Sequence, residues 1–306
     1  MKKLILFFIA MICILPINAQ EVTVGLLLEK GKVYHQIVES KNAMVQEFSG
    51  QKVDVQMSTK YSVSFLVKEI LNGSYHMEAS FSKMSITMTM PQNTLEFSSE
   101  KKDVNDIISN ILGGMVNKPF EVYISNTGQV TSVVGIEANY TSVIAQLNTI
   151  TVAQSEQIKP HIIRSFGDGV FRGNLSSVTS VLPGKSVKVG DKWAGRTRRL
   201  LMSSTMVGRS EVELSEIGST YIVLKNKGTM VTRDKNELVA SYGRPMKYDL
   251  TGTYSSLIKI DKATGWVVNA KVSHEVAGNA TIEKSTELPA GMVVPVTIKG
   301  DLIYTE

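Results

Sequence analysis

Cysteine is nearly absent from this sequence, with Cys13 the only one among 306 residues. The chain beyond Cys13 can therefore form no disulfide bond and offers neither a thiol nucleophile nor a thiolate metal ligand. Its stability must come from the packing of a hydrophobic core. A chain of this length can bury most of its apolar surface as one large domain or two ordinary ones.

Recognisable catalytic motifs are also missing. The sequence contains no G-x-S-x-G elbow, no H-E-x-x-H pair and no glycine loop for phosphate. His76 and Glu78 can share one strand face, but two ligands are fewer than a metal site needs. We therefore expect no metal and no cofactor, and no catalytic residue is assigned. The four histidines are scattered along the chain, at His35, His76, His161 and His274.

Long apolar runs are absent apart from one, Leu4–Leu15. Lys2 and Lys3 precede this run, and Pro16 and Ala19 follow it. The run is shorter than the roughly 18 to 20 residues that span a bilayer, so the pattern predicts a signal peptide over residues 1–19. We expect cleavage between Ala19 and Gln20, export to the periplasm or the medium, and no transmembrane segment in the mature chain.

Lipidation of Cys13 is disfavoured by its neighbours. Ile12 stands where a lipoprotein signal has a small residue, and the apolar run continues through Ile14 and Leu15. We therefore expect a mature protein without an acyl anchor.

The excess of positive charge is small, at +5. This is too little to indicate a nucleic-acid partner. Basic residues gather between Lys185 and Arg199, where Asp191 is the one acidic residue. We interpret this basic segment as a solvated strand face or as a surface for an anionic lipid or glycan. Its basic members are Lys185, Lys188, Lys192, Arg196, Arg198 and Arg199.

Strand patterns, in contrast, are abundant. Residues 52–70 and 75–90 are rich in β-branched and aromatic residues and flank the turn signal Asn72-Gly73, which predicts a long hairpin. A second group of strands is predicted from about residue 191 onwards. It comprises residues 209–217, 220–232, 247–260, 265–275, 279–286 and 292–304.

Methionines alternate with polar residues in the second arm of the first hairpin. Met84, Ile86, Met88 and Met90 point to one side of the predicted strand, because successive side chains of a strand face opposite ways. Methionine is flexible and polarizable, so this face suits either an ordinary core or the lining of a site for an apolar ligand.

Helical spacing is found between the two groups of strands. Apolar residues recur with that period over residues 104–112, 140–147 and 158–166, which predicts about three short amphipathic helices. We divide the chain into a signal peptide (1–19), an N-terminal β block (20–135), a helical connector (136–182) and a C-terminal β block (183–306). The two blocks are expected to share one core.

The two blocks resemble each other in their turns. Thr127-Gly128 closes a predicted hairpin in the first block, and Thr264-Gly265 closes one in the second. The predicted fold is β-dominated α+β. Two antiparallel meanders form a curved sheet or half-open barrel, with the helices between them. The likeness of the two blocks reflects either a degenerate duplication or a coincidence of turn chemistry.

The segment from Leu182 to Trp193, which ends in Gly190-Asp191-Lys192-Trp193, is the most distinctive of the sequence. Together with Thr264-Gly265-Trp266 it resembles a family of exported bacterial proteins of the Bacteroidota type, catalogued as a domain of unknown function, family 6263. The resemblance covers nearly the whole chain beyond the signal peptide. It implies export and this fold, and it transfers no catalytic residue.

Three hypotheses about function follow. The first is a non-catalytic cell-envelope protein that binds an apolar or amphiphilic, lipid-like ligand, similar in outline to periplasmic lipoprotein carriers. The second is a structural or interaction protein of the periplasm that contacts another envelope protein and has no ligand pocket. The third is an envelope hydrolase whose catalytic groups come together from distant strands.

Overall fold

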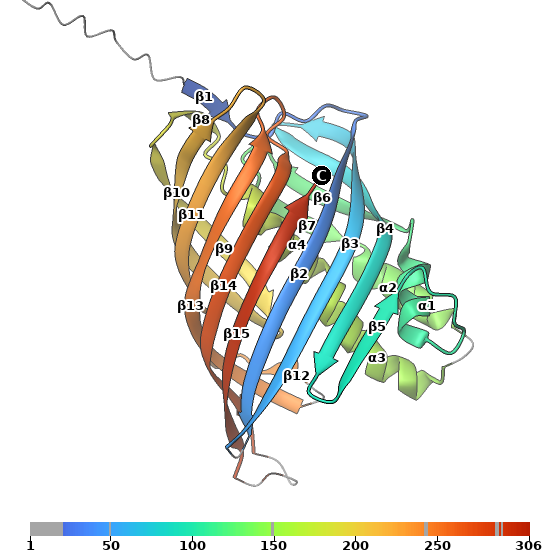
Figure 1. Ribbon diagram of the computed structural model, residues 1–306. Coiled ribbons are helices and arrows are strands. Elements are labelled where there is room, and N and C mark those ends of the chain that lie inside the picture. Colours follow the sequence, from blue (N-terminus) through green and yellow to red (C-terminus); the bar gives the residue numbers. More distant parts are fainter. Residues whose placement is uncertain (1–20, 49, 148–149, 242–243, 285–287, 289) are drawn as a thin grey trace, which may run out of the picture.

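A large antiparallel sheet dominates the molecule (Figure 1). The computed structural model describes residues 21–48, 50–147, 150–241, 244–284, 288 and 290–306. The predicted signal peptide, with Cys13 and the cleavage site at Ala19 and Gln20, lies outside the described residues. The strands are β1 (Glu21–Val24), β2 (Val33–Phe48), β3 (Gln51–Leu71), β4 (Ser74–Met90), β5 (Asn93–Ser98), β6 (Pro119–Ser125), β7 (Val130–Val134), β8 (Lys185–Lys188), β9 (Lys192–Leu201), β10 (Ser204–Ile217), β11 (Tyr221–Thr232), β12 (Val239–Ser241), β13 (Arg244–Asp261), β14 (Val267–Ile282) and β15 (Met292–Thr305).

Four helices accompany the strands. They are α1 (Ile107–Met115), α2 (Ile136–Ala145), α3 (Val152–Phe166) and α4 (Asp168–Thr179). The first three cover the segments in which sequence spacing predicts helices. The fourth, α4, was not predicted, and only Gly167 separates it from α3.

The main sheet has 13 strands, and its strand order is β7-β6-β4-β3-β2-β15-β14-β13-β11-β10-β9. β5 pairs with β4 and β12 with β13, while β1 and β8 form a separate two-stranded sheet. The sheet is curved but not closed, because β7 and β9 end the order without pairing with each other. The predicted β-dominated α+β class with a curved, open sheet is confirmed.

The first predicted hairpin shows how turn chemistry sets the strand register. Asn72 and Gly73 have φ angles of 48° and 74°, which are the positive values that a tight two-residue turn requires. Leu71 therefore pairs with Ser74, and β3 and β4 run antiparallel from there, apart from two register shifts. The predicted hairpin is confirmed.

The two predicted blocks are joined in one sheet and share its larger apolar cluster. β2 of the N-terminal block pairs with β15 of the C-terminal block, and the larger apolar cluster contains residues from both. α1 lies within the N-terminal block, and β1 pairs across the blocks with β8. Gly128 and Gly265 have similar φ angles of 74° and 69°, while a common origin of the blocks stays a prediction.

The helices cover one face of the sheet, which we call the inner face; the opposite face is the outer face. Aromatic rings hold the two layers together, and Phe171 of α4 packs against Phe65, Phe81 and Phe120 of the sheet with ring centroids 5.0 to 6.2 Å apart. Each such ring buries about 150–250 Å². A second, smaller apolar cluster lies on the inner face away from the helices and contains residues such as Met230, Val276 and Ile298.

Candidate functional site

The two edge strands of the open sheet are joined by a helix. α4 packs against both β7 and β9, so it fills the gap in which a closed sheet would continue its hydrogen bonds. Gly173 of α4 lies directly on β9, because a Cβ there would stand 3.3 Å from the Cα of Arg199. We call this junction of β7, α4 and β9 the seam.

Two hydrogen bonds fix α4 in the seam. The hydroxyl of Thr179, the last residue of α4, donates to the carbonyl oxygen of Gly128 at 2.6 Å. On the other side, the indole Nε1 of Trp193 in β9 donates to the carbonyl oxygen of Val181 at 2.8 Å. Gly128 has to be glycine, since a Cβ would lie 2.0 Å from the carbonyl oxygen of Thr179.

A groove of about 1320 Å³ runs along the seam. It is bordered by α4, by β9, β10 and β11, and by the start of β7. Alternation along β9 turns Arg196 and Arg198 to the outer face, and Arg209 follows on β10. α4 contributes Arg172, which also lines the groove. Gly169 and Ser176, three and four residues away, lie on the same face of the helix and line the groove as well. We call it the arginine groove.

Positive charge in the arginine groove is not neutralised. None of the described residues that line it is an aspartate or a glutamate. Within the described part of the chain, Arg172, Arg196, Arg198 and Arg209 form no ion pair. Elsewhere on the same sheet such pairing is common, as for Lys192 and Glu211, whose Nζ and Oε1 atoms are 2.8 Å apart.

Arg196 and Arg209 stand directly opposite each other on β9 and β10. Side chains in such positions have Cβ atoms about 4.5–5.5 Å apart, and two like charges there destabilise the sheet. Apolar side chains, among them Leu182, Leu200 and Val207, line the same groove. The arrangement therefore suits a ligand that has both an anionic group and an apolar part.

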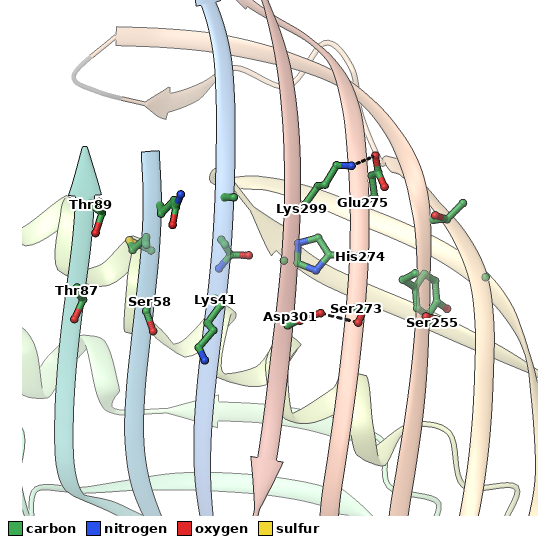
Figure 2. Close-up of a pocket in the computed structure, with 18 of the residues that line it drawn as sticks. Lys41, Ser58, Thr87, Thr89, Ser255, Ser273, His274, Glu275, Lys299 and Asp301 are labelled. Carbon is green, nitrogen blue, oxygen red and sulfur yellow. Dashed lines mark hydrogen bonds and ion pairs between the residues drawn. The ribbon is translucent and has the colours of Figure 1, made fainter. Parts of the chain in front are cut away.

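A second groove, of about 880 Å³, crosses the sheet from β4 to β11, and buried residues such as Tyr254 and His274 line it together with exposed charged ones (Figure 2). Its charged side chains include Lys41, Lys299, Glu275 and Asp301, which project from neighbouring strands. Several of these charges are already neutralised: Lys299 lies 2.9 Å from Glu275, and Asp301 lies 2.9 Å from Lys271. A paired, polar surface of this kind is the weaker candidate for a binding site.

The methionines that the sequence marks as candidate ligand-lining residues face inward. Met84 and Ile86 are buried in the larger core, whereas Met88 and Met90 are half-buried. None of these four residues lines either of the two grooves described above. The alternation placed all four on one face, and their role as a ligand lining stays a prediction.

His76 and Glu78, the two candidate metal ligands, each have another partner. His76 pairs with Glu121 and stacks on Tyr123 with ring centroids 4.6 Å apart. Glu78 forms an ion pair with Lys68 at 3.5 Å. Among the described residues, no three His, Cys, Asp or Glu side chains are grouped closely enough to hold a metal ion.

Comparison with known proteins places the chain in a family. The model of a family of unknown function, DUF6263, matches residues 72–267. The chain belongs to this family. The matched region contains α4, β9 and β10, so the arginine groove lies mostly within the DUF6263 region. No curated protein matches the sequence.

Solved structures give only distant likenesses. The β domain of the Bordetella autotransporter BrkA has 8% identity and a TM-score of 0.20, and the match covers 89% of this chain and 99% of that one. The COG4313 outer membrane channel of Pseudomonas putida F1 has 6% identity and a TM-score of 0.22, with 92% and 97% covered. Scores this low carry no argument about this DUF6263 protein. Among its described residues, no helix has the length and apolar character to cross a membrane.

The basic segment from Lys185 to Arg199 is divided by the fold. Arg196, Arg198 and Arg199 all line the arginine groove, but Arg196 and Arg198 are exposed, whereas Arg199 turns to the inner face and is 9% exposed. No sequence pattern links Arg172 or Arg209 to this set. Only the spacing of Arg196 and Arg198 could have indicated from sequence that these two side chains lie together, because residues two apart on a strand share a face.

Proposed function

We propose that this chain is an exported, non-catalytic cell-envelope protein that binds an amphiphilic ligand with an anionic group in the arginine groove. The observation that carries the proposal is the direct pairing of Arg196 with Arg209 in a groove that has no acidic lining residue among those described. This arrangement costs stability when the groove is empty. An anionic group between the two guanidiniums would remove the repulsion and accept charge-assisted hydrogen bonds from both.

The apolar residues of the groove support an amphiphile over a small polar anion. Leu200 is 36% exposed and Val231 is 45% exposed, and both line the groove. An acyl chain or another apolar group that covers them gains about 25 cal/mol for each Å² removed from water. Export, which the predicted signal peptide supports, would bring the protein to the compartment in which membrane amphiphiles are handled.

The test compares two lysolipids with the same acyl chain. Protein purified from cells that express the full chain is titrated by calorimetry with lysophosphatidylglycerol and with lysophosphatidylcholine, below their micellar concentrations. We expect tighter binding of the anionic lipid. The Arg196→Met/Arg198→Met variant should lose about tenfold or more of this affinity, since a hydrogen bond to a charged group contributes about 1.5–3 kcal/mol.

The matched control removes the same charge elsewhere. Lys52→Met/Lys60→Met takes two exposed cations from the outer face of β3, away from the groove, and should leave the affinity unchanged. Equal affinities of the unmodified protein and the arginine variant would overturn the proposal, as would an absence of lipid binding. A specific envelope protein recovered by cross-linking, without lipid binding, would instead favour an interaction protein.

A further inference from the structure

A further groove lies between helix α3 and the turn that joins β9 to β10. It has a volume of about 490 Å³, and we call it the α3 groove. Pro160 and Ile163 of α3, Val170 of α4 and Met202 of the turn give it apolar walls. Each of these four residues is at least partly exposed, so the walls are accessible to a ligand.

The α3 groove and the arginine groove meet at Gly169 and Leu200, which line both of them. Gly169 stands in the first turn of α4, directly against Leu200 of β9. A Cβ at Gly169 would lie 2.7 Å from Leu200 Cδ1, so a larger residue there would displace the leucine from the junction. The α3 groove therefore continues the arginine groove.

The outward side of β9 changes from charged to apolar toward this junction. Arg196 and Arg198 are followed by Leu200, which is two residues further on and so lies on the same face. Met202 comes next, in the turn. Because a strand rises about 3.3 Å per residue, Arg198 and Met202 are at most roughly 13 Å apart. A single acyl chain covers such a distance, and a compact anion does not.

Charges in the α3 groove are balanced, unlike those of the arginine groove. Among the described residues that line it, Glu137 and Glu156 oppose Lys159 and Arg164. A groove without an excess of charge offers no preference for an anionic group, whereas its apolar walls gain free energy when a ligand displaces water from them. The anionic part of a ligand therefore fits the arginine groove, and its apolar part fits the α3 groove.

The turn between β9 and β10 has an unfavourable sequence for its backbone. Met202 and Ser203 are its two central residues, and their φ angles are 51° and 67°. Asn72 and Gly73 adopt nearly the same angles, 48° and 74°, in the corresponding turn between β3 and β4. Asparagine and glycine are the residues that such a turn favours, whereas methionine is strained at a positive φ.

Core packing accounts for only part of the Met202 side chain. Met202 packs against the smaller apolar cluster, but it is not fully buried and it also lines the α3 groove. It thus combines a strained backbone with an apolar surface that stays exposed to solvent. Strain of this kind is concentrated at ligand sites, where binding compensates for the stability that the residue costs.

We propose that the α3 groove binds the acyl chain of the amphiphile whose anionic group lies between Arg196 and Arg209. This inference rests on the proposed function and adds the course of the ligand to it. The headgroup lies at the paired arginines, the chain passes over Leu200, and its end lies between α3 and Met202. The ligand class is thereby narrowed to anionic lipids with a linear acyl chain.

The test uses lysophosphatidylglycerols that differ only in the length of the acyl chain, titrated by calorimetry below their micellar concentrations. For the unmodified protein, we expect the affinity to rise by up to about fourfold with each methylene, the gain from burying a CH₂ group, and to level off once the chain fills the groove. Arg196→Met/Arg198→Met should lower the affinity for every chain length by one common factor and leave this rise unchanged.

Two variants of the α3 groove should flatten the rise with chain length. Met202→Asn removes an apolar wall and suits the positive φ, so the turn is kept. Ile163→Gln removes another wall and keeps a residue that favours a helix. The matched control is Leu257→Asn, which removes an apolar side chain that is 52% exposed on β13 and lines neither groove. It should leave the rise unchanged.

The outcomes separate this inference from the proposed function. An arginine-dependent affinity that does not change with chain length would overturn the inference alone, because the headgroup would still be bound. An equal rise in Met202→Asn, Ile163→Gln and the unmodified protein would overturn it in the same way. No binding of any of these lipids, or binding that does not depend on Arg196 and Arg198, would overturn both.

A direct measurement on the unmodified protein keeps the test valid if a variant does not fold. The protein is irradiated with a lysophosphatidylglycerol that carries a diazirine at the end of its chain, and the labelled residues are identified by mass spectrometry. We expect labels on α3 and on Met202. Val231 of β11 lines the arginine groove and is 45% exposed. Labels around Val231 without labels on α3 would show that the chain takes another course, and would overturn the inference.

Discussion

Gly300 of β15 and His274 of β14 face each other across neighbouring strands, and the imidazole occupies the space that a side chain at position 300 would need. A Cβ on Gly300 would lie 2.6 Å from His274 Cε1 and 2.2 Å from Asn42 Oδ1. The glycine therefore lets two polar side chains from adjacent strands converge over the β15 backbone. This convergence leaves no room for a larger residue at position 300 without a shift of one of the two side chains.

The first prediction tests this convergence. Gly300→Ala should lower the free energy of unfolding by about 1–3 kcal/mol, the usual cost of overpacking a well-packed interior. Urea unfolding measures it. Lys299→Ala, on the outer face of the same strand, is the control and should stay within about 0.5 kcal/mol of the unmodified protein. If the two variants have the same stability, the imidazole does not need the space above Gly300.

The second prediction concerns acid. Burial and the nearby charge of Arg199 lower the pKa of His274 from 6.5 to about 3. The unfolded chain takes up this proton near pH 6.5 and the folded chain only near pH 3, so the free energy of unfolding should fall as the pH drops through that window. The loss should reach up to roughly 4 kcal/mol.

The pH dependence of His274→Gln provides the comparison. The stabilities of the unmodified protein and the variant, measured by urea unfolding without added halide, should converge as the pH falls from 6.5 to 4. NMR should show the His274 ring neutral at pH 4.5. A ring that titrates near pH 6.5 would show instead that water reaches the inner face freely.

Much of the sheet could be predicted because local patterns determine strands and tight turns. The alternation around Met84 identifies the inner face of β4, and Asn72-Gly73 fixes the register of β3 against β4. Alternation cannot decide what covers a face. An alternating apolar residue can be buried in the core, as Met84 is, or it can line a cavity, and the alternation is the same in both cases.

The candidate site could be predicted only in part, because it depends on contacts between distant segments. Arg196 and Arg198 share a strand face by spacing alone, but Arg209 joins them through the register of β9 against β10. Arg172 comes from α4, whose glycines and serines, such as Gly173 and Ser176, weaken the helical pattern. The approach of Asn42 and His274 over Gly300 depends on the register of three strands, and the sequence specifies such a register only where a tight turn joins two of them.

The third prediction tests how the seam is held. Trp193→Phe removes the indole donor to the Val181 carbonyl but keeps most of the aromatic surface. The free energy of unfolding should fall by about 1 kcal/mol, the contribution of one neutral hydrogen bond. Amide exchange in α4 should accelerate more than exchange in β14. Uniform acceleration across the sheet would contradict a local role of this bond in anchoring α4.

The fourth prediction separates stability from binding in the arginine groove. Arg196→Thr removes one of two like charges that stand opposite each other, and threonine suits a strand. Without ligand, the variant should be more stable than the unmodified protein by about 0.2–1 kcal/mol. Its affinity for lysophosphatidylglycerol should nevertheless fall. Lys299→Thr is the control: Lys299 stands opposite Glu275 on β14 and lies 2.9 Å from it, so its removal should not raise stability and should leave the lipid affinity intact. A loss of both stability and affinity in Arg196→Thr would mean that Arg196 supports the strand rather than a ligand, because a residue kept for binding is expected to cost stability in the empty protein.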